Sequence, residues 1–321
     1  MELLRIKSLK KYFPVKKGFF STASENVKAV DDISFNLNEK EVLGLVGESG
    51  CGKTTLGRLI VQLEKATEGE VYLQQSQNLC SLSNKELLPY RQKLQMIFQD
   101  PYSSLNPRMR VGDIIEEGIK IHKLASSKKE STEKVLKIMH AVGLDESQVN
   151  RFPHEFSGGQ RQRIGIARSL AIEPKVIVAD EPVSALDVSI QAQIINLLQK
   201  LKEDFSLSII FISHDLSVVG YISQRVAVMY LGKFVEYGSK EEIFDNPLHP
   251  YTTALLNAVP KPDPKTKGNK IFLEGDVPSP ISPPSGCYFH PRCPKCFEPC
   301  SKIQPTLKPI ANNHFVACHL Y

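Results

Sequence analysis

A glycine-rich run that ends in lysine and two threonines constrains the fold of this chain more than any other feature. Residues 47–55 read Gly-Glu-Ser-Gly-Cys-Gly-Lys-Thr-Thr and fit the pattern Gly-x-x-x-x-Gly-Lys-[Ser/Thr]. The apolar run Val42–Val46 before it predicts a buried strand, and the amphipathic run Thr55–Leu63 after it predicts a helix. Such a turn points backbone N–H groups and the positive end of a helix dipole at one spot, which suits a nucleotide triphosphate.

Within this loop the residue types match the chemistry of phosphate binding. Its glycines let the backbone approach a phosphate without a Cβ clash. Lys53 is predicted to lie against the β- and γ-phosphates, and Thr54 is predicted to offer a hydroxyl to Mg²⁺. Cys51 is interpreted as a tolerated small residue rather than a redox switch. The predicted nucleotide contacts here are Gly47, Glu48, Ser49, Gly50, Cys51, Gly52, Lys53, Thr54 and Thr55.

Composition limits the function only loosely. The chain has 321 residues, of which 41% are hydrophobic and 23% are charged, so it is long enough for two or three globular domains. A net charge of +5 is small for this length and does not by itself indicate a nucleic-acid partner. The sequence contains no apolar run long enough to span a membrane and opens on no signal segment. It therefore predicts a cytosolic protein that could attach to a membrane protein.

Short patterned runs predict the rest of the core. Leu3–Leu9 and Val27–Leu37 alternate apolar and polar residues, as half-exposed strands do, and Glu70–Leu73 and Leu94–Phe98 also indicate strands. Residues 101–150 change to helical spacing, which predicts a separate and mostly helical lobe.

An aromatic pair follows the first predicted strand. Tyr12 and Phe13 lie in residues 10–14, which are interpreted as a turn. A ring at this place could stack on adenine, although a lone aromatic residue is more often a packing residue.

Two later motifs sit where helices begin or strands end. Ser157-Gly158-Gly159-Gln160 precedes the apolar-periodic helix Arg161–Ile172, so it is either a plain helix cap or a second phosphate contact.

The second motif is the apolar run Val176–Glu181, which is interpreted as a buried strand that ends in Asp180 and Glu181. It presents two carboxylates at the strand end, where ligands collect in doubly wound sheets. Asp180 is predicted to hold the Mg²⁺ shell, and Glu181 is predicted to face the attacking water.

A further apolar strand, Leu207–Ser213, ends at His214, which could contact the γ-phosphate. Taken singly, paired acids are often solvated and a lone histidine is often structural, but their joint order favours a catalytic site.

Assembled in this order, the motifs resemble the ATPase subunit of ATP-binding-cassette (ABC) transporters over essentially residues 1–250. The resemblance implies an α/β fold: a P-loop NTPase (RecA-like) core sheet with an antiparallel β subdomain, a helical subdomain and a C-terminal Cys-rich extension. It implies ATP and Mg²⁺ as cofactors, with Thr54, Gln99 and Asp180 as the Mg²⁺ ligands. Phe156 stands where the family usually has leucine, a mild apolar change. The resemblance implies that Gly47–Thr55 is the Walker A loop, Gln99 the Q-loop residue and Ser157–Gln160 the signature core. It implies Walker B for Asp180, the catalytic base for Glu181 and the D-loop for Ser184–Asp187, with Asp187 at the nucleotide. It also implies that His214 is the H-loop switch and that Phe13 stacks on adenine.

The same resemblance implies the domain boundaries. They are a nucleotide-binding core with Walker A and the antiparallel β subdomain at 1–100, a helical subdomain at 101–157, a core with the signature, Walker B, D-loop and H-loop at 158–245, and a Pro-rich, Cys-rich extension at 246–321.

Stretches outside the catalytic set narrow the resemblance. Residues 99–109 and 246–251 resemble the peptide/nickel branch of importer ATPases, and more narrowly its F-type oligopeptide/dipeptide subunit. The Pro-rich segment 259–286 is interpreted as an extended connector. The branch implies uptake of short peptides at the cytoplasmic face of the cell membrane. Nickel or glutathione uptake, an ABC ATPase outside transport and an inert regulatory module remain as alternatives.

The partners implied by the resemblance are two transmembrane permease subunits, a second and homologous ATPase subunit, and an external peptide-binding protein. Two cassettes pair head to tail, which would explain two phosphate-reading helix N-termini in one chain. A heterodimer is expected rather than a homodimer, and no nucleic acid is expected. The helical lobe, entered through Gln99 and Asp100, is where the permease is expected to press.

Five of the seven cysteines lie after residue 286. Four soft thiolates suit an iron–sulfur cluster or Zn²⁺, and the pair Cys293-x-x-Cys296 has zinc-like spacing. The resemblance to peptide-importer ATPases implies a [4Fe-4S] cluster, and a tail without any metal is the remaining alternative. Cys296 would then be a spare thiol. The ligands expected for the cluster are Cys287, Cys293, Cys300 and Cys318.

Overall fold

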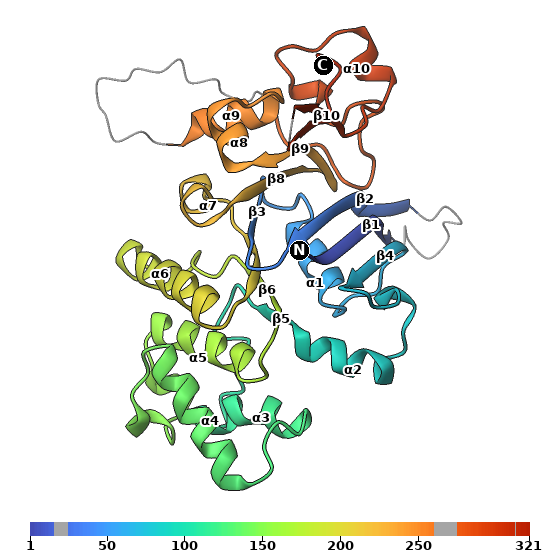
Figure 1. Cartoon of the computed structure of the whole chain (residues 1–321). Coiled ribbons are helices and arrows are strands. Elements are labelled where there is room, and N and C mark those ends of the chain that lie inside the picture. The colour runs from blue at the N-terminus through green and yellow to red at the C-terminus, as the bar shows by residue number, and fades with distance from the viewer. Residues whose placement is uncertain (16–24, 260–274, 312) are drawn as a thin grey trace.

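A mixed sheet of eight strands forms the centre of the computed structural model, which describes residues 1–15, 25–259, 275–311 and 313–321 (Figure 1). Five neighbouring strands are parallel, and three antiparallel strands extend the sheet at one side. From one edge to the other the strands are β10 (Lys308–Ala311), β11 (His314–Val316), β9 (Lys233–Ser239), β8 (Arg225–Tyr230), β3 (Val42–Val46), β7 (Ser208–Ile212), β6 (Val176–Asp180) and β5 (Leu94–Ile97).

The parallel strands are buried on both faces, which explains their continuous apolar runs. In β3, Val42 and Val46 belong to the core on one face of the sheet, whereas Leu43 and Leu45 belong to the core on the other. The predicted strands at 42–46, 94–98, 176–180 and 207–213 are therefore confirmed to within a residue or two at their ends.

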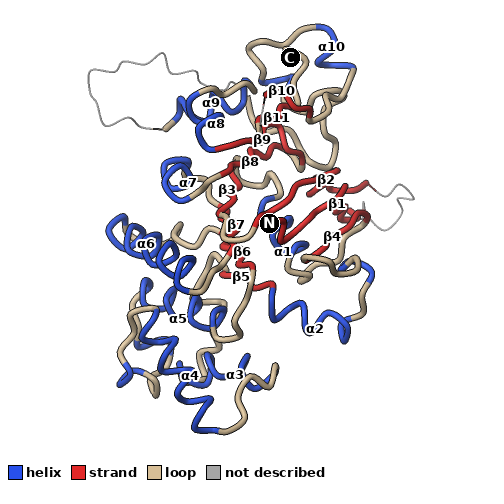
Figure 2. Tube along the Cα trace, viewed as in Figure 1, coloured by secondary structure: helices blue, strands red, loops and turns tan. Residues whose placement is uncertain are grey.

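A second, three-stranded antiparallel sheet packs beside the first in the order β2 (Glu25–Asn38), β1 (Glu2–Val15) and β4 (Glu68–Leu73) (Figure 2). The predicted turn at residues 10–14 is wrong, because β1 continues to Val15 and Phe13 pairs with Val27 of β2. Lateral pairing with a long partner strand outweighs the local turn signal of Pro14 here.

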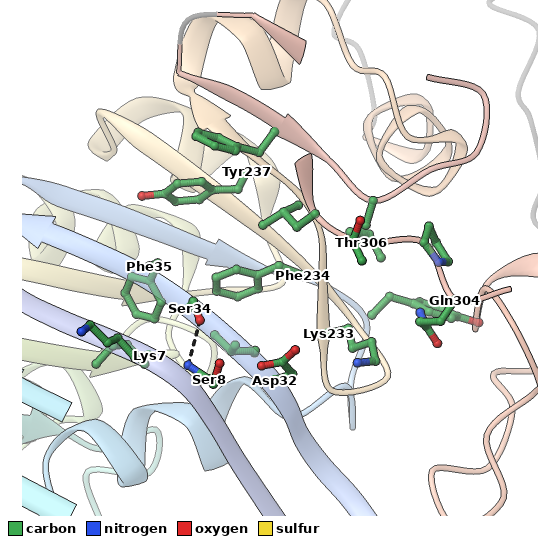
Figure 3. A pocket seen from close by; sticks show the side chains of 18 of the residues that line it. Lys7, Ser8, Asp32, Ser34, Phe35, Lys233, Phe234, Tyr237, Gln304 and Thr306 are labelled. Atoms are coloured by element: carbon green, nitrogen blue, oxygen red, sulfur yellow. Dashed lines mark hydrogen bonds between the residues drawn. The ribbon is translucent and has the colours of Figure 1, made fainter. Parts of the chain in front are cut away.

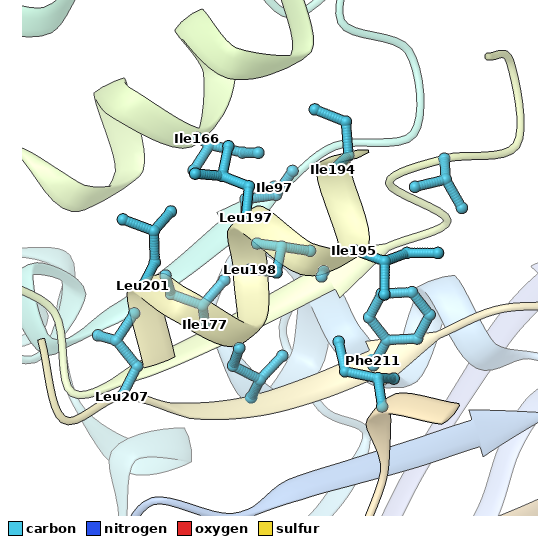
Figure 4. Packing of buried hydrophobic residues seen from close by; sticks show 14 of the residues in the cluster. Ile97, Ile166, Ile177, Ile194, Ile195, Leu197, Leu198, Leu201, Leu207 and Phe211 are labelled. Carbon is cyan, nitrogen blue, oxygen red and sulfur yellow. The ribbon is translucent and has the colours of Figure 1, made fainter. Parts of the chain in front are cut away.

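The helices cover the sheet and form a lobe at one end of the molecule (Figure 1). In Figure 4, apolar residues of α6 such as Leu198 pack towards Ile177 and Phe211 of the central strands. The helices predicted at 55–63 and 161–172 begin earlier and end two or three residues sooner than expected. The bounds are α1 (Lys53–Ile60), α2 (Asn84–Lys93), α3 (Val111–Ile121), α4 (Lys128–Ala141), α5 (Gly158–Leu170), α6 (Val188–Asp204), α7 (Leu216–Ile222), α8 (Lys240–Asp245), α9 (Pro250–Ala258) and α10 (Glu298–Lys302).

The predicted helical lobe, residues 101–157, contains α3 and α4 and ends one residue before α5 begins. Across the stretches of chain that the structure describes, no helix is both long enough and apolar enough to cross a membrane.

The C-terminal extension lies at the opposite end of the molecule from this lobe (Figure 1). It joins the central sheet through β11, which pairs with β9, so it is not an isolated tail. Of the predicted connector at 259–286, residues 260–274 lie outside the described residues.

A pocket of about 640 Å³ lies where the extension meets the antiparallel sheet. Figure 3 shows Phe35 and Phe234 near its floor, with Gln304 and Thr306 contributed by the extension.

Candidate nucleotide-binding site

The phosphate loop between β3 and α1 has the backbone shape that its glycines predict. Gly52 has a φ of 105°, and a Cβ atom there would lie 1.9 Å from the carbonyl oxygen of Ala29. A Cβ on Gly47 would lie 2.2 Å from the carbonyl oxygen of Met229. Only glycine therefore fits at these two positions, because neighbouring backbone presses against the loop from β2 and β8.

Lys53 is the first residue of α1 and is only 5% exposed. Its Nζ donates to the carbonyl oxygens of Gly47, at 2.7 Å, and Glu48, at 2.9 Å. The loop thus wraps around the ammonium group of Lys53. This group lies at a helix N-terminus, which also carries positive partial charge. This arrangement suits the charge of a triphosphate.

Next to Lys53, the Thr54 hydroxyl donates to Asp180 Oδ1 at 2.9 Å. Asp180 is the last residue of β6 and is 2% exposed, and this burial raises the pKa of its carboxyl group. A hydroxyl and a buried carboxylate are hard oxygen ligands, so these two residues fit a Mg²⁺ ion.

Glu181 follows β6 with a positive φ of 44°, an uncommon conformation for glutamate. Its N–H donates to the carbonyl oxygen of Ile212 in the neighbouring strand, which helps to hold this geometry. Gln99 Nε2 donates to Glu181 Oε2 at 3.0 Å, and His214 Nδ1 lies 3.3 Å from the same oxygen. Gln99 and His214, which follow two other strands of the sheet, therefore both contact the carboxylate of Glu181.

A single cleft of about 650 Å³ is lined by Lys53, Thr54, Gln99, Glu181 and His214. Gly47, Glu48, Cys51 and Asp180 are not among the described residues that border it. Phe13 of β1 borders the cleft, whereas Tyr12 is not among the described residues that do, and its hydroxyl donates to Asp31 at 2.6 Å. The residues around the cleft are Phe13, Val27, Ala29, Ser49, Gly50, Gly52, Lys53, Thr54, Thr55, Gln99, Glu181, His214 and Pro280.

The predicted signature residues lie elsewhere. Ser157 caps α5, and its Oγ accepts from the N–H of Gln160 at 3.3 Å. Ser157, Gly158 and Asp187 are exposed, and none of the residues 157–160 or Asp187 is among the described residues that border the cleft. Within one chain the structure thus separates the two predicted phosphate-reading helix starts.

The C-terminal cysteines form a loose group. Burial raises the pKa of Cys287 to about 11, and the nearby thiols of Cys300, Cys318 and Cys293 add to this shift. Burial also raises the pKa of Cys293 and Cys318, again with other cysteines of the group as neighbours. In the ranges that the structure describes, however, no three His, Cys, Asp or Glu side chains are arranged to hold a metal ion.

Fold and cleft together define a P-loop ATPase, in which a glycine-rich loop lies beside the buried Asp180 and the carboxylate of Glu181. Comparison with protein families agrees with this class. The family described as "ABC transporter" matches residues 30–184, and the family described as "Oligopeptide/dipeptide transporter, C-terminal region" matches residues 235–300. The chain belongs to the ABC transporter ATPases, and its C-terminal region is that of oligopeptide/dipeptide transporters.

Individual relatives match over nearly the full chain. The oligopeptide transport ATP-binding protein AppF of Bacillus subtilis (strain 168) is 52% identical, over 99% of this chain and 97% of that protein. The dipeptide transport ATP-binding protein DppF of Escherichia coli (strain K12) is 51% identical, over 98% of this chain and 93% of that protein.

Among solved structures, the ATP-binding cassette MJ0796 in a dimeric post-hydrolysis state with ADP and Pi superposes with a TM-score of 0.65. It is 30% identical and covers 74% of this chain and 99% of that one.

Two residues that contact the phosphate loop are not predicted by the sequence patterns. Arg292 and Tyr251 of the C-terminal extension both contact Glu48. No local pattern marks Arg292, because its partner lies 244 residues away. Tyr251 lies in residues 246–251, whose resemblance to peptide importers does not indicate a contact with the phosphate loop.

Proposed function

We propose that this chain is the ATP-hydrolysing subunit of an importer that takes up dipeptides or oligopeptides across the cytoplasmic membrane. One observation carries the proposal: a cleft that joins the phosphate loop to Gln99, Glu181 and His214, and a C-terminal region of the oligopeptide/dipeptide transporter type, occur in the same chain. The relatives named above are themselves peptide transport ATP-binding proteins. The chain would sit peripherally on the cytoplasmic face of the membrane.

The chemistry proposed for the cleft is phosphoryl transfer to water. Lys53 and the start of α1 offset the charge of the β- and γ-phosphates, and the Phe13 ring stacks on adenine. Glu181 accepts a proton from the attacking water, and Gln99 and His214 hold its carboxylate in place. Mg²⁺, held by Thr54, Asp180 and Gln99, would supply further charge neutralisation at the phosphates.

The exposure of Ser157, Gly158 and Asp187 supports a composite site. We propose that Ser157–Gln160 and Asp187 act on the nucleotide bound by a second and homologous ATPase subunit, and that this subunit is a different chain. ATP would then hold the two subunits together, and hydrolysis would release them, which provides the two-state element that drives transport.

The permease is proposed to dock on the helical lobe. Tyr102, just after the Q-loop, is 63% exposed and stacks with Arg161, whose Cζ lies 5.0 Å from the ring centroid. Crosslinks from the two permease subunits to residues 101–125 would support this docking. Crosslinks confined to the cysteine-rich tail would refute it.

For the tail we propose a [4Fe-4S] cluster on Cys287, Cys293, Cys300 and Cys318. The proximity of the four thiols supports it, and the thiols would have to move closer than they are here. Iron and acid-labile sulfide in anaerobically purified protein would decide in favour of the cluster. Stoichiometric zinc, or no metal, would decide against it.

Reconstitution with two permease subunits, the partner ATPase and the external binding protein tests the whole proposal. We expect short peptides to stimulate ATP hydrolysis, and we expect Glu181→Gln to lower the rate by about a hundredfold or more while ATP still binds. Stimulation by nickel complexes or glutathione, and not by peptides, would assign the same ATPase role to another cargo. Hydrolysis that ignores all three ligands would contradict the importer proposal.

A further inference from the structure

Glu48, the second residue of the phosphate loop, is held on three sides. Its carboxylate accepts from both terminal nitrogens of Arg292, at 2.8 and 3.1 Å. Its backbone N–H donates to the hydroxyl of Tyr251 at 2.9 Å, and its carbonyl accepts from Lys53 Nζ at 2.9 Å. Arg292 and Tyr251 both belong to residues 246–321, so the C-terminal extension supplies two of these three tethers.

The tethers from the extension are buried. The Arg292 side chain is 7% exposed, the Glu48 side chain is 25% exposed, and Tyr251 is fully buried. Tyr251 packs with Tyr230 and Phe289, with ring centroids 4.7 and 5.3 Å away. A bidentate guanidinium–carboxylate pair on this aromatic base fixes orientation as well as charge, since its two parallel hydrogen bonds allow little rotation.

The two halves of the phosphate loop therefore have different anchors. At the later half, the carbonyl of Cys51 accepts from the N–H of Gly232 at 2.9 Å, and Gly232 belongs to the β8–β9 turn of the core. At the earlier half, Glu48 is tied to the extension. A glycine-rich loop that is ordered before ATP arrives loses less conformational entropy when ATP binds.

We propose that Arg292 is a positioning residue of the ATP site, through which the C-terminal extension holds the phosphate loop in its nucleotide-binding shape. This inference rests on the ATPase function proposed above and adds a long-range dependence of the ATP site. Docking of the extension and binding of ATP are then thermodynamically coupled, and the coupling is reciprocal: ATP also tightens the docking of the extension.

The first test measures ATP binding to the full chain in the Glu181→Gln background, and ATP hydrolysis in the assembled transporter. We expect Arg292→Gln to raise the Kd and the KM for ATP by about tenfold with little change in kcat. Arg292→Lys should restore part of the affinity, because it keeps the charge but not the bidentate geometry. Unchanged Kd and KM, or a loss confined to kcat, would overturn the proposal.

Lys302→Gln serves as the matched control. Lys302 pairs with Glu298 at 2.8 Å in the same extension, but both side chains are exposed, at 67% and 80%. We expect this variant to bind and hydrolyse ATP like the parent chain. A Kd raised equally by Lys302→Gln would show a general effect of charge in the extension and would refute a specific role for Arg292.

Tyr251→Phe provides a second route if Arg292→Gln folds poorly. It removes only the hydroxyl that accepts from the Glu48 N–H, and it keeps the ring in the aromatic cluster. We expect a smaller rise in the Kd for ATP, in the same direction. A Tyr251→Phe chain with normal thermal stability and unchanged Kd would count against the tethering of Glu48.

Hydrogen–deuterium exchange tests the reciprocal effect. In the Glu181→Gln chain, Mg·ATP should slow exchange in residues 287–293, and the additional change Arg292→Gln should abolish this protection. Protection that persists without Arg292 would refute the coupling. A Glu181→Gln chain that fails to bind ATP at all would instead contradict the proposed function, so the two failures can be told apart.

Discussion

At the residue scale, Asp180 has a proposed role in Mg²⁺ binding, but its buried charge lowers the stability of the folded chain. It is 2% exposed, and burial raises its pKa above the ordinary 3.8. In the folded chain without nucleotide, the ionised carboxylate is therefore less favourable than in the unfolded chain. A cation at the proposed Mg²⁺ site beside Thr54 would offset this cost when ATP binds.

Asp180→Asn should therefore stabilise the nucleotide-free protein while it lowers hydrolysis by about a hundredfold or more. The amide keeps an acceptor for the Thr54 hydroxyl but removes the buried charge, and we expect the Tm at neutral pH to rise by about 2 °C. The ionisation cost is complete above the folded-state pKa, so the gain should vanish as the pH falls below 3.8. A variant that is less stable at neutral pH would contradict this account.

At the element scale, α3 and α4 are joined by one buried acid. Glu116 of α3 accepts from Lys128 Nζ at 2.9 Å and from the Ser131 hydroxyl at 2.7 Å, both on α4. Burial by itself would raise the pKa of Glu116, but hydrogen bonds from Lys120, Lys128 and Ser131 outweigh it and lower the pKa to about 2. The carboxylate of Glu116 therefore links the two helices of the lobe that is proposed to face the permease.

Glu116→Gln should destabilise this lobe by about 1–3 kcal/mol, measured by urea unfolding and by proteolysis of residues 101–150. The folded-state pKa is depressed, so the stabilisation is complete above the ordinary value of 4.5 and is lost as the pH falls towards 2. Glu133→Gln is the control, because Glu133 is exposed on α4, the helix that Glu116 contacts, and pairs only weakly with Lys129. Equal effects of both changes would rule out this link between the helices.

Elements of the central sheet were predictable where both faces of a strand are buried, because such strands read as unbroken apolar runs. The cleft was predictable for the same reason, since Asp180, Glu181 and His214 each follow such a run. The strands β10 and β11 were not predicted: β10 is exposed along its length and contains Pro309, so local propensity does not reveal it. The pairing of Arg292 with Glu48 is set by tertiary contact and has no local signal.

At the scale of the whole molecule, one chain presents half of each proposed nucleotide site. The phosphate loop opens into the cleft, while Ser157 and Gly158, at the start of α5, are exposed and lie outside it. The dimeric state of the cassette MJ0796 bound to ADP and Pi fits this division.

We therefore expect ATP to join a Glu181→Gln chain to its partner ATPase in a one-to-one complex on sedimentation. Ser157→Arg should prevent the complex and leave the Kd for ATP of the single chain unchanged. Ser147→Arg, at another exposed serine of the helical lobe, should allow the complex to form and should also leave the Kd for ATP unchanged. A complex that forms normally with Ser157→Arg would contradict the composite site.

The pairing of β11 with β9 has one more consequence. Without the extension, β9 would present an open row of backbone donors and acceptors, which is a template for pairing with another chain. The chain instead ends the sheet at β10, whose Lys308 and Pro309 are poor partners for a further strand. A version that stops at Asp245 should therefore aggregate, as measured by light scattering, even though it keeps every residue that borders the cleft except Pro280. The extension would thus prevent aggregation through the edge of β9, and it would also support the ATP site.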